Sequence, residues 1–541
     1  MEFQFANAWE VIADTIPDKP ALICGDRLRT WREYDDRAAR IATALTRAGL
    51  GPDAKVGIYL HNSNEYLEAQ YATFKIRGCP INVNYRYKAD ELIYLLDNAD
   101  AQAVVYQSCY AARIWEIQAR LPKVKCFIEV ADGTENIPVK GRVDYESTIR
   151  SNAPMARIDR RADEVYMLYT GGTTGMPKGV MYPNGLVCMA FIAGGFSARG
   201  LEPPTSMAEL PGKIRDIHAQ GLAPTSLAAC PLMHGTGMWL GAMMPLLAGG
   251  TAVTISALGL DPDRIWEHVQ RLDVTDIAIV GDAFAKPLLG ALDDAAARGA
   301  PYKLQSLRRI ISSGVMFSNE VKRGLLAHHD MTLHDAMGST EGGMASSVAT
   351  RDSINETAKF TLSPGVKVFT DEGAEVQPGS EQIGKVATSG MVPIGYYKDP
   401  NKSAETFREI DGVRYSFPGD YAQVQADGTI TLLGRGSQCI NTAGEKVFPE
   451  EVEEVVKQHP DVYDCLVVGV PDQRFGERVV AVTSLRENRT TIDTDIVEYT
   501  RMRVAGYKVP KHVLLVDEVK RAANGKADYK WAKQWALNEL Q

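Results

Sequence analysis

The chain has 541 residues, of which 45% are hydrophobic and 23% are charged, the composition of an ordinary water-soluble globular protein. This length exceeds what a single hydrophobic core supports, so we expect at least two domains. The net charge of −9 and the isoelectric point near 5.6 argue against a general attraction to nucleic acid or to an anionic membrane surface.

The scatter of the cysteines and the lack of long apolar runs argue against further classes of protein. The eight cysteines are scattered, with no CxxC pair and no clustered histidines, so we expect reduced thiols rather than a zinc site or a disulfide framework. No run approaches the ~18 apolar residues of a membrane span. The first residues, MEFQFANAWEVIAD, have no apolar core of signal-peptide length. A cytoplasmic protein without integral membrane contact is therefore expected, although a peripheral contact stays open.

The N-terminal part of the chain alternates helical and extended patterns. Apolar residues at helical spacing predict a helix over 31–48, and period and composition predict further elements. These are strands at 55–60, 80–83 and 103–106, and helices ending near 78 and spanning 90–98. The alternation predicts a layered α/β domain with a largely parallel sheet.

The stretch Tyr169 to Gly179, YTGGTTGMPKG, combines glycines, threonines and one lysine after a β-rich approach. Glycines let backbone N–H groups approach phosphate oxygens, threonines add hydroxyl donors, and the lysine adds a positive charge. The order is not that of a Walker A loop, because Pro177 precedes Lys178 and another strand follows. An ordinary Gly-rich hairpin is the alternative. The candidate ATP-binding residues are Thr170, Gly171, Gly172, Thr173, Thr174, Gly175 and Lys178.

The order strand, Ser/Thr/Gly loop, Pro-Lys-Gly, strand resembles the signature of the adenylate-forming superfamily. That superfamily contains acyl-CoA synthetases, luciferases and the adenylation domains of peptide synthetases. The resemblance implies ATP-dependent activation of a carboxylic acid as an acyl-adenylate. It also implies an α/β fold, with a large compound N-terminal domain of layered α/β subdomains and a small mobile α+β C-terminal domain.

Downstream of this loop, candidates for the acyl pocket follow a polar, Pro-rich stretch at 197–226. That stretch is either a functional flap or a surface excursion. A single histidine among apolar residues is more often a core residue, but the resemblance implies that His234 and Trp239 line the acyl pocket. Two further predicted strands end before Gly281 and at Ser313-Gly314, where α/β sheets place ligands. The resemblance assigns Gly281 to the acyl tunnel and Ser313 and Gly314 to adenine.

A second motif, DAMGSTE, spans 335–341 and resembles the aromatic-Gly-x-Thr-Glu motif of the superfamily. The resemblance implies that Thr340 contacts the α-phosphate and that Glu341 holds Mg²⁺, for which one carboxylate with phosphate oxygens suffices. The alternative is a helix N-terminus capped by Ser339. Met337 stands where the superfamily has an aromatic residue that stacks on adenine. Met337, Gly338 and Ser339 complete the expected nucleotide contacts.

The remaining candidates lie nearer the C-terminus. The resemblance implies that Asp420 binds the ribose hydroxyls, that Arg435 contacts ribose or phosphate, and that Ser437 is the hinge. It thus divides the chain into an adenylating domain, 1–434, and a mobile domain, 435–541. Predicted strands at 464–470, 478–485 and 512–516 and a helix near 493–503 make the latter a compact α+β domain. Gly444 and Lys446 are expected near CoA, and Lys526, after Gly525, is the expected catalytic lysine.

Taken over the whole chain, the motifs resemble those of an acyl-CoA synthetase. The variants at 396–399, 434–437 and 444–447 narrow the resemblance to ligases of steroid side-chain or bile-acid carboxylates. ATP, Mg²⁺ and CoA as a substrate are therefore expected, with a bulky apolar acid such as a steroid side chain or a fatty acid. Loading of an acyl carrier protein in place of CoA is the alternative. No nucleic acid partner is expected, and whether the chain forms a homodimer is left open.

Overall fold

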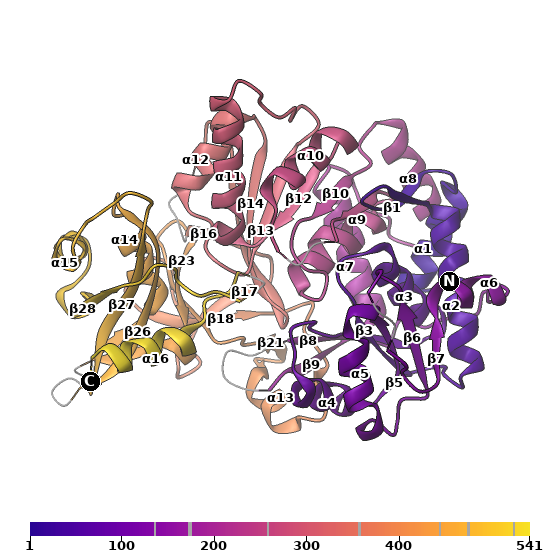
Figure 1. The fold of residues 1–541 in the computed structure, drawn as a ribbon. Helices are drawn as coiled ribbons and strands as arrows, with labels where there is room; N and C mark the ends of the chain where they lie inside the picture. The colour runs from indigo at the N-terminus through magenta and orange to yellow at the C-terminus, as the bar shows by residue number, and fades with distance from the viewer. Residues whose placement is uncertain are drawn as a thin grey trace. The chain divides into compact units, whose positions relative to one another are not determined.

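The computed structural model describes the chain except residues 135–136, 171–175, 257–258, 355–358, 443–444, 473–475, 523–524 and 541. The chain forms two compact units. The first unit comprises Met1–Gly343, Val348–Ile354 and Gly390–Glu409, and the second comprises Met344–Ser347, Asn355–Ser389 and Ile410–Gln541. The fold is mixed α/β, as predicted (Figure 1). The predicted boundary between 434 and 435 stays a prediction.

A parallel sheet forms one layer of the first unit. Its strands have the order β4-β3-β5-β6-β7, and every pair is parallel. The strands are β3 (Lys55–Tyr59), β4 (Cys79–Asn82), β5 (Ala101–Gln107), β6 (Cys126–Val130) and β7 (Arg142–Asp144). The helices of this region are α2 (Trp31–Arg47), α3 (Asn64–Lys75), α4 (Ala89–Asn98), α5 (Ala111–Ile117) and α6 (Tyr145–Ser151). The predicted alternation of strands and helices is thus confirmed.

A second sheet contains a mostly parallel run of strands in the order β2-β1-β11-β10-β12-β13-β14. The strands of this run are β1 (Pro20–Cys24), β2 (Arg27–Thr30), β10 (Thr225–Ala228), β11 (Thr251–Thr254), β12 (Asp276–Ile279), β13 (Arg309–Ser313) and β14 (Thr332–Ser339). Figure 1 shows α10 (Pro262–Leu272), α11 (Gly281–Ala297) and α12 (Asn319–His328) beside β12, β13 and β14. Buried Trp266, Leu288 and Leu325 from these helices share one core with Ile310 of β13.

The polar stretch at 197–226 contains a packed helix. It follows α7 (Asn184–Ser197) and carries α8 (Leu210–Ala219). Leu210, Ile214 and Ile217 of α8 are fully buried in the same core as α1 (Phe5–Thr15). Apolar residues at helical spacing therefore anchor the middle of this stretch in the core. The prolines of the stretch make this helical pattern hard to recognise in the sequence.

A small three-stranded sheet completes the first unit. The hairpin of β8 (Val165–Thr170) and β9 (Lys178–Pro183) pairs Thr170 with Lys178, and β19 (Gly395–Tyr396) runs antiparallel to β9. The distant segment 395–399 is therefore brought beside the predicted phosphate loop.

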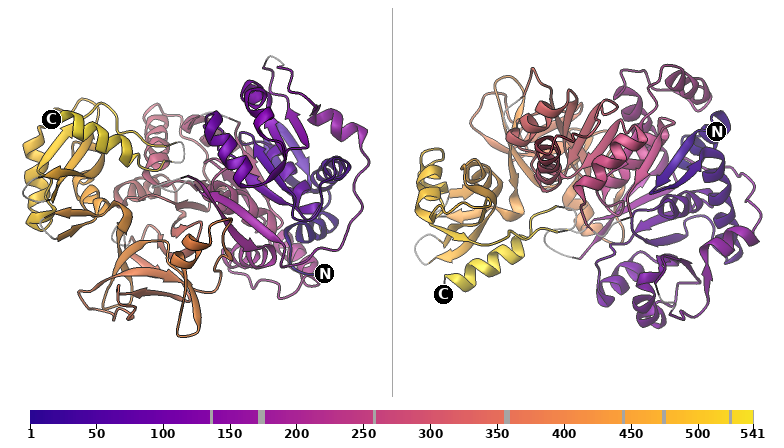
Figure 2. Two further views of the ribbon diagram at one scale, coloured as in Figure 1. Left: turned by 90° about the horizontal axis from the view of Figure 1, so that it is seen from below. Right: turned by 45° about the horizontal axis from the view of Figure 1, so that its top comes forward.

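The second unit contains antiparallel strands and a C-terminal α+β layer. The antiparallel strands are β16 (Lys359–Leu362), β17 (Val366–Phe369), β18 (Ile383–Thr388), β21 (Val413–Ser416), β22 (Asp420–Val424) and β23 (Ile430–Arg435). The C-terminal sheet has the order β25-β24-β27-β26, with β28 beside β27. Its elements are β24 (Ile440–Thr442), β25 (Glu445–Val447), β26 (Val462–Asp472), β27 (Gly476–Leu485), β28 (His512–Leu515), α14 (Pro449–Lys457), α15 (Asp493–Arg501) and α16 (Tyr529–Glu539). Figure 2 shows α16 in yellow at the C-terminus.

Candidate active site

The predicted phosphate loop joins β8 and β9. Thr170 ends β8 and Lys178 begins β9. Gly171, Gly172, Thr173, Thr174 and Gly175 lie outside the described residues, so their nucleotide contacts stay predictions. A hairpin agrees with the sequence-based distinction from a Walker A loop, which would lead into a helix.

Lys178 is held by the segment that contains β19. Its ammonium forms an ion pair with Asp399 and lies 5.8 Å from the centre of the Tyr396 ring. Asp399 also caps α13 (Pro400–Thr406), since its Oδ1 accepts from the Lys402 N–H at 3.0 Å. The hydrogen bond from Lys178 holds the pKa of Asp399 below its usual range. The ammonium of Lys178, the candidate phosphate-binding group, is therefore held in a defined position.

Thr340 and Glu341 lie in the tight turn between β14 and β15 (Gly342–Ala349). Tyr182 Oη donates to the Thr340 carbonyl at 2.9 Å, and Tyr396 Oη donates to Glu341 Oε1 at 2.8 Å. The Glu341 N–H donates to Ser339 Oγ at 3.1 Å. The alternative of a helix N-terminus at Ser339 is wrong, because the chain turns directly from one strand into the next. Glu341 is oriented by side chains rather than by a helix dipole.

The candidate adenine contacts lie at the carboxyl ends of two parallel neighbours. β13 pairs Ser313 with Ala336 of β14, and Ser313 Oγ donates to the Ala336 carbonyl at 2.7 Å. The next residue of β14, Met337, is buried. Gly314 has a φ of +94°, which favours glycine. Gly338 packs against the β15 backbone, since an added Cβ would lie 3.2 Å from the Gly342 carbonyl oxygen.

The candidate acyl residues lie around the start of an unusual helix. Trp239 is in a π-helix, Thr236–Met243, a feature frequent at functional sites. Its Nε1 donates to Tyr166 Oη at 2.7 Å, so the indole is fixed. His234 lies just before this helix, with its N–H donating to the Pro231 carbonyl at 3.2 Å. A Cβ on Gly314 would lie 3.9 Å from Thr236 Oγ1, so the adenine and acyl candidates are adjacent.

Backbone packing requires a glycine at position 281, the third acyl candidate. Its φ is +49°, and an added Cβ would lie 2.3 Å from the Met316 carbonyl oxygen. Its N–H donates to Ser312 Oγ at 2.9 Å. The glycine thus has a structural reason that is independent of any acyl contact, and its contact with the acid stays a prediction.

Two asparagines that the sequence analysis missed connect these loops. Asn82 Oδ1 accepts from the Tyr169 N–H at 2.7 Å, and its Nδ2 donates to the Tyr169 and Met233 carbonyls at 2.9 and 2.7 Å. Asn62 donates to the Cys230 carbonyl at 3.1 Å and accepts from the Leu232 N–H at 2.8 Å. Both asparagines follow or end parallel strands, the position at which α/β sheets place functional groups, so their position could have identified them.

The other candidates belong to the second unit. Asp420 of β22 pairs in register with Arg435 of β23. The side chains of Arg435, Ser437 and Lys446, and all of Gly444, lie outside the described residues. The backbone of Ser437 lies in a short 3₁₀ turn, Gly436–Gln438. Lys526 follows Gly525, and its carbonyl accepts from the Ala522 N–H at 2.8 Å.

Among the described residues of the first unit, the candidate ligand for a magnesium ion is Glu341. Glu341 presents a carboxylate that Tyr396 orients. Hard oxygen donors are what Mg²⁺ prefers, and one carboxylate plus phosphate oxygens and water is a common set. Among the described residues no group of three or more His, Cys, Asp or Glu could hold a metal ion, so the site fits a nucleotide-borne magnesium rather than a protein cage.

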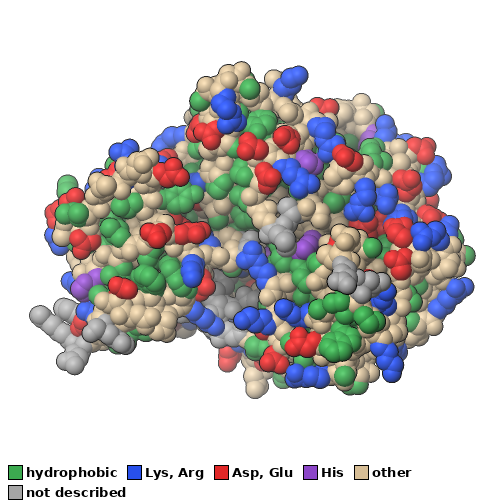
Figure 3. Space-filling view, in the orientation of Figure 1, with side chains coloured by type: hydrophobic (Ala, Val, Ile, Leu, Met, Phe, Trp, Pro, Cys, Tyr) green, Lys and Arg blue, Asp and Glu red, His purple; other side chains and the backbone are tan. Residues whose placement is uncertain are grey.

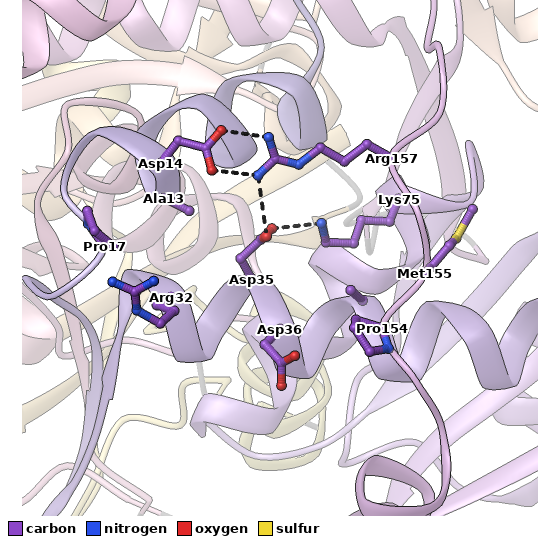
Figure 4. Close-up of a pocket in the computed structure, with 11 residues that line it drawn as sticks. Ala13, Asp14, Pro17, Arg32, Asp35, Asp36, Lys75, Pro154, Met155 and Arg157 are labelled. Carbon is purple, nitrogen blue, oxygen red and sulfur yellow. Dashed lines mark hydrogen bonds and ion pairs between the residues drawn. The ribbon is translucent and has the colours of Figure 1, made fainter.

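A separate cavity of about 350 Å³ lies near the N-terminus of the first unit, and Figure 4 shows its charged lining. Arg157 forms a bidentate pair with Asp14 at 2.6 and 2.7 Å, and Lys75 contacts Asp35 at 2.7 Å. None of the candidate site residues lines it. Because these charges satisfy one another, we interpret the cavity as part of an ion-pair network.

The remaining surface and the helices add two observations. Figure 3 shows acidic and basic side chains interspersed over the visible face. Within the described part of the chain, no helix is both long enough and apolar enough to cross a membrane.

Comparison with known proteins places the chain in a family. The sequence profile of AMP-binding enzymes matches residues 9–397, and that of the AMP-binding enzyme C-terminal domain matches residues 451–526. The chain belongs to the AMP-binding enzyme family. The resemblance stated from the motifs is thereby confirmed, and this AMP-binding enzyme is an acid–thiol ligase of the AMP-forming type.

Its relatives and structural neighbours span almost the whole chain. A 3-oxocholest-4-en-26-oate–CoA ligase of Rhodococcus rhodochrous is 39% identical over 98% of this chain and 96% of that protein. A medium/long-chain-fatty-acid–CoA/3-oxocholest-4-en-26-oate–CoA ligase of Mycolicibacterium smegmatis is 39% identical over the same shares. The crystal structure of the anthranilate CoA ligase AuaEII with anthranoyl-AMP has a TM-score of 0.84 at 22% identity, covering 100% of this chain and 99% of that one. The likeness to AuaEII confirms the predicted fold class.

Proposed function

We propose that this enzyme uses ATP and Mg²⁺ to convert a bulky apolar carboxylic acid into its acyl-adenylate, and then transfers the acyl group to CoA. The observation that carries the proposal is the joint placement of Lys178 and Glu341. One segment, 396–399, contacts both of them beside the β8–β9 hairpin. A cation and a candidate metal-binding carboxylate that one segment holds near each other are what an anionic polyphosphate requires.

The chemistry requires charge cancellation rather than a side-chain nucleophile. The acid's carboxylate attacks the α-phosphorus of ATP, pyrophosphate leaves, and the CoA thiol then displaces AMP. Magnesium on the nucleotide supplies positive charge for the developing pyrophosphate. In this proposal Glu341 holds that ion, Lys178 and Thr340 bind phosphate oxygens, and Lys526 bridges the carboxylate and the α-phosphate.

The acid is proposed to be a steroid side-chain or fatty acid. Relatives that match 98% of this chain are named for 3-oxocholest-4-en-26-oate and for medium- and long-chain fatty acids. Half-buried His234 and Trp239, which flank Thr236 beside the adenine candidate Gly314, are the proposed acyl contacts, with Gly281. A cytoplasmic location and a homodimer belong to the same proposal, and cell fractionation and sedimentation test them.

Pyrophosphate release tests the substrate class. The panel is acetate, benzoate, octanoate, palmitate and 3-oxocholest-4-en-26-oate, each with and without CoA. We expect the larger apolar acids to be turned over fastest, and sustained turnover only with CoA. Acetate or benzoate activated far better than the others would refute the proposed acid. Rapid turnover with a holo acyl carrier protein in place of CoA would favour the carrier-loading alternative.

A further inference from the structure

The turn that carries Lys526 is closed by backbone hydrogen bonds. Arg521 and Ala527 form an antiparallel bridge. The Ala522 N–H donates to the Lys526 carbonyl at 2.8 Å, and the Gly525 N–H donates to the Ala522 carbonyl at 2.9 Å. Gly525 is buried at a φ of +72°, a conformation that favours glycine. The backbone on both sides of Lys526 is therefore held.

Arg521 adds a side-chain anchor to this turn. Its Nη1 donates to the Gly525 carbonyl at 3.1 Å, directly before Lys526. Its Nε and Nη2 donate to the two carboxylate oxygens of Asp464 at 2.6 and 2.8 Å. The rigid fork of a guanidinium can make these three bonds at once, which a lysine ammonium cannot reproduce.

Asp464 of β26 is in turn held by Lys457 of α14, which also contacts buried Glu453 of the same helix. Lys457 Nζ lies 3.5 Å from Asp464 Oδ1 and 3.7 Å from Glu453 Oε2. Glu453 Oε1 accepts from the Val467 N–H at 2.9 Å. Burial alone would raise the pKa of Asp464, but Lys457 and Arg521 hold this pKa well below its usual range. The carboxylate therefore stays ionised and keeps the guanidinium in place.

We infer that Arg521, fixed by Asp464, is a positioning residue that aims Lys526 at the acyl-adenylate-forming step. This inference rests on the proposed role of Lys526. A catalytic group displaced by about 1 Å can lose roughly 10²-fold in rate. The loss should fall on adenylation alone, because the CoA step does not use Lys526.

The test separates the two half-reactions in the full-length enzyme. ATP–pyrophosphate exchange measures adenylation, with the panel acid that the wild type activates fastest. Thioester formation is measured from the synthetic acyl-adenylate of that acid and CoA. The first variant, Arg521→Lys, keeps the positive charge but lacks the forked guanidinium. The second, Asp464→Asn, removes the carboxylate that holds this guanidinium. Arg489→Lys is the matched control, because it alters an ion pair with Asp461 in the same unit.

For Arg521→Lys and Asp464→Asn we expect adenylation to fall by about 10²-fold with thioester formation near the wild-type rate, and neither step to change in Arg489→Lys. Parallel loss of both steps would show that Arg521 only supports the fold, and unchanged adenylation would show that the anchor is dispensable. A further variant, Lys526→Ala, distinguishes failure of the proposed role of Lys526 from failure of the inference about Arg521.

If Lys526→Ala affects both steps equally, the proposed role of Lys526 fails and this inference falls with it. If only Lys526→Ala separates the steps, the inference about Arg521 alone is refuted.

Discussion

Tyr396 donates its phenolic hydrogen to Glu341 Oε1 across 2.8 Å, although 55 positions separate the two residues. Strand pairing brings the two together: β19 adds to the edge of β9, and Tyr182 of β9 donates to the carbonyl of Thr340, the neighbour of Glu341. A carboxylate that takes this bond from one side is left with limited freedom to rotate. We therefore regard Tyr396 as the group that orients the proposed magnesium ligand.

Tyr396→Phe should lower the apparent affinity of the enzyme for Mg²⁺. Loss of the group that orients a metal ligand typically costs 10- to 100-fold in metal affinity or activity, so we expect the Mg²⁺ concentration for half-maximal pyrophosphate release to rise by about 10-fold. Tyr397→Phe is the control, since that hydroxyl bonds Asp100 at 2.7 Å. Equal shifts in both variants, or none, would contradict the role of Tyr396.

Lys526→Ala should separate the two half-reactions. Removal of one preorganised charge contact typically costs about 10²- to 10³-fold in rate, and we expect at least this loss in ATP-dependent adenylation. Conversion of a supplied acyl-adenylate and CoA to the thioester should stay near the wild-type rate. Rapid-quench assays of each step give the comparison, and an equal loss in both would assign Lys526 to the fold or to the CoA site.

Ser437→Pro should block the proposed pivot between the half-reactions. Proline fixes φ near −65°, and the backbone of Ser437 lies in a 3₁₀ turn. Adenylation should survive while thioester formation falls, measured with the same two assays. Ser437→Ala, which leaves φ free, is the control. A pivot elsewhere, or a damaged fold, would instead lower both steps together.

Gly281→Ala should destabilise the first unit. The added Cβ would meet the Met316 carbonyl oxygen at 2.3 Å in a residue whose φ is +49°, and strain of this kind costs of order 1–3 kcal/mol. Gly290 is the matched control, because it lies in the same helix, α11, with nothing within 4 Å of an added Cβ. Gly290→Ala should be neutral or stabilising by about 0.4–1 kcal/mol. Urea unfolding followed by tryptophan fluorescence compares them, and equal midpoints would refute the packing argument.

Asp335 should make stability depend on pH in the acid range. Burial raises the pKa of Asp335 to about 6 from 3.8, despite the nearby charge of Lys322. Because the folded state then binds the proton more tightly than the unfolded state, the contribution of Asp335 to the free energy of unfolding falls as pH rises from about 4 to about 6.

The double variant Asp335→Asn/Lys322→Met tests this contribution. It removes both charges of the buried pair, whose Nζ–Oδ2 distance is 3.2 Å, and so avoids the unpaired ammonium that Asp335→Asn alone would leave. We expect a flatter stability profile between pH 4 and 6 in urea unfolding than in the wild type. An unchanged slope would assign the pH dependence to other groups.

The sequence by itself determined the α/β alternation, the order of the nucleotide motifs and the family. These features are local, because Lys178, Thr340 and Glu341 each lie within a short run whose residue types suit phosphate or magnesium. Helix and strand periods, likewise, are properties of neighbouring residues. The boundaries of α2, α4 and β5 accordingly lie within about two residues of the predicted ones.

Only the tertiary structure decided which groups hold those motifs in place. Asp399 lies 221 positions from Lys178, Asn82 lies 87 from Tyr169, and Asp464 lies 57 from Arg521. No local pattern predicts such contacts, because the packing of distant segments against one another brings the residues together. The same reason explains the turn at Ser339, whose Ser-x-Glu order suits a helix cap, yet whose neighbours pair as strands β14 and β15.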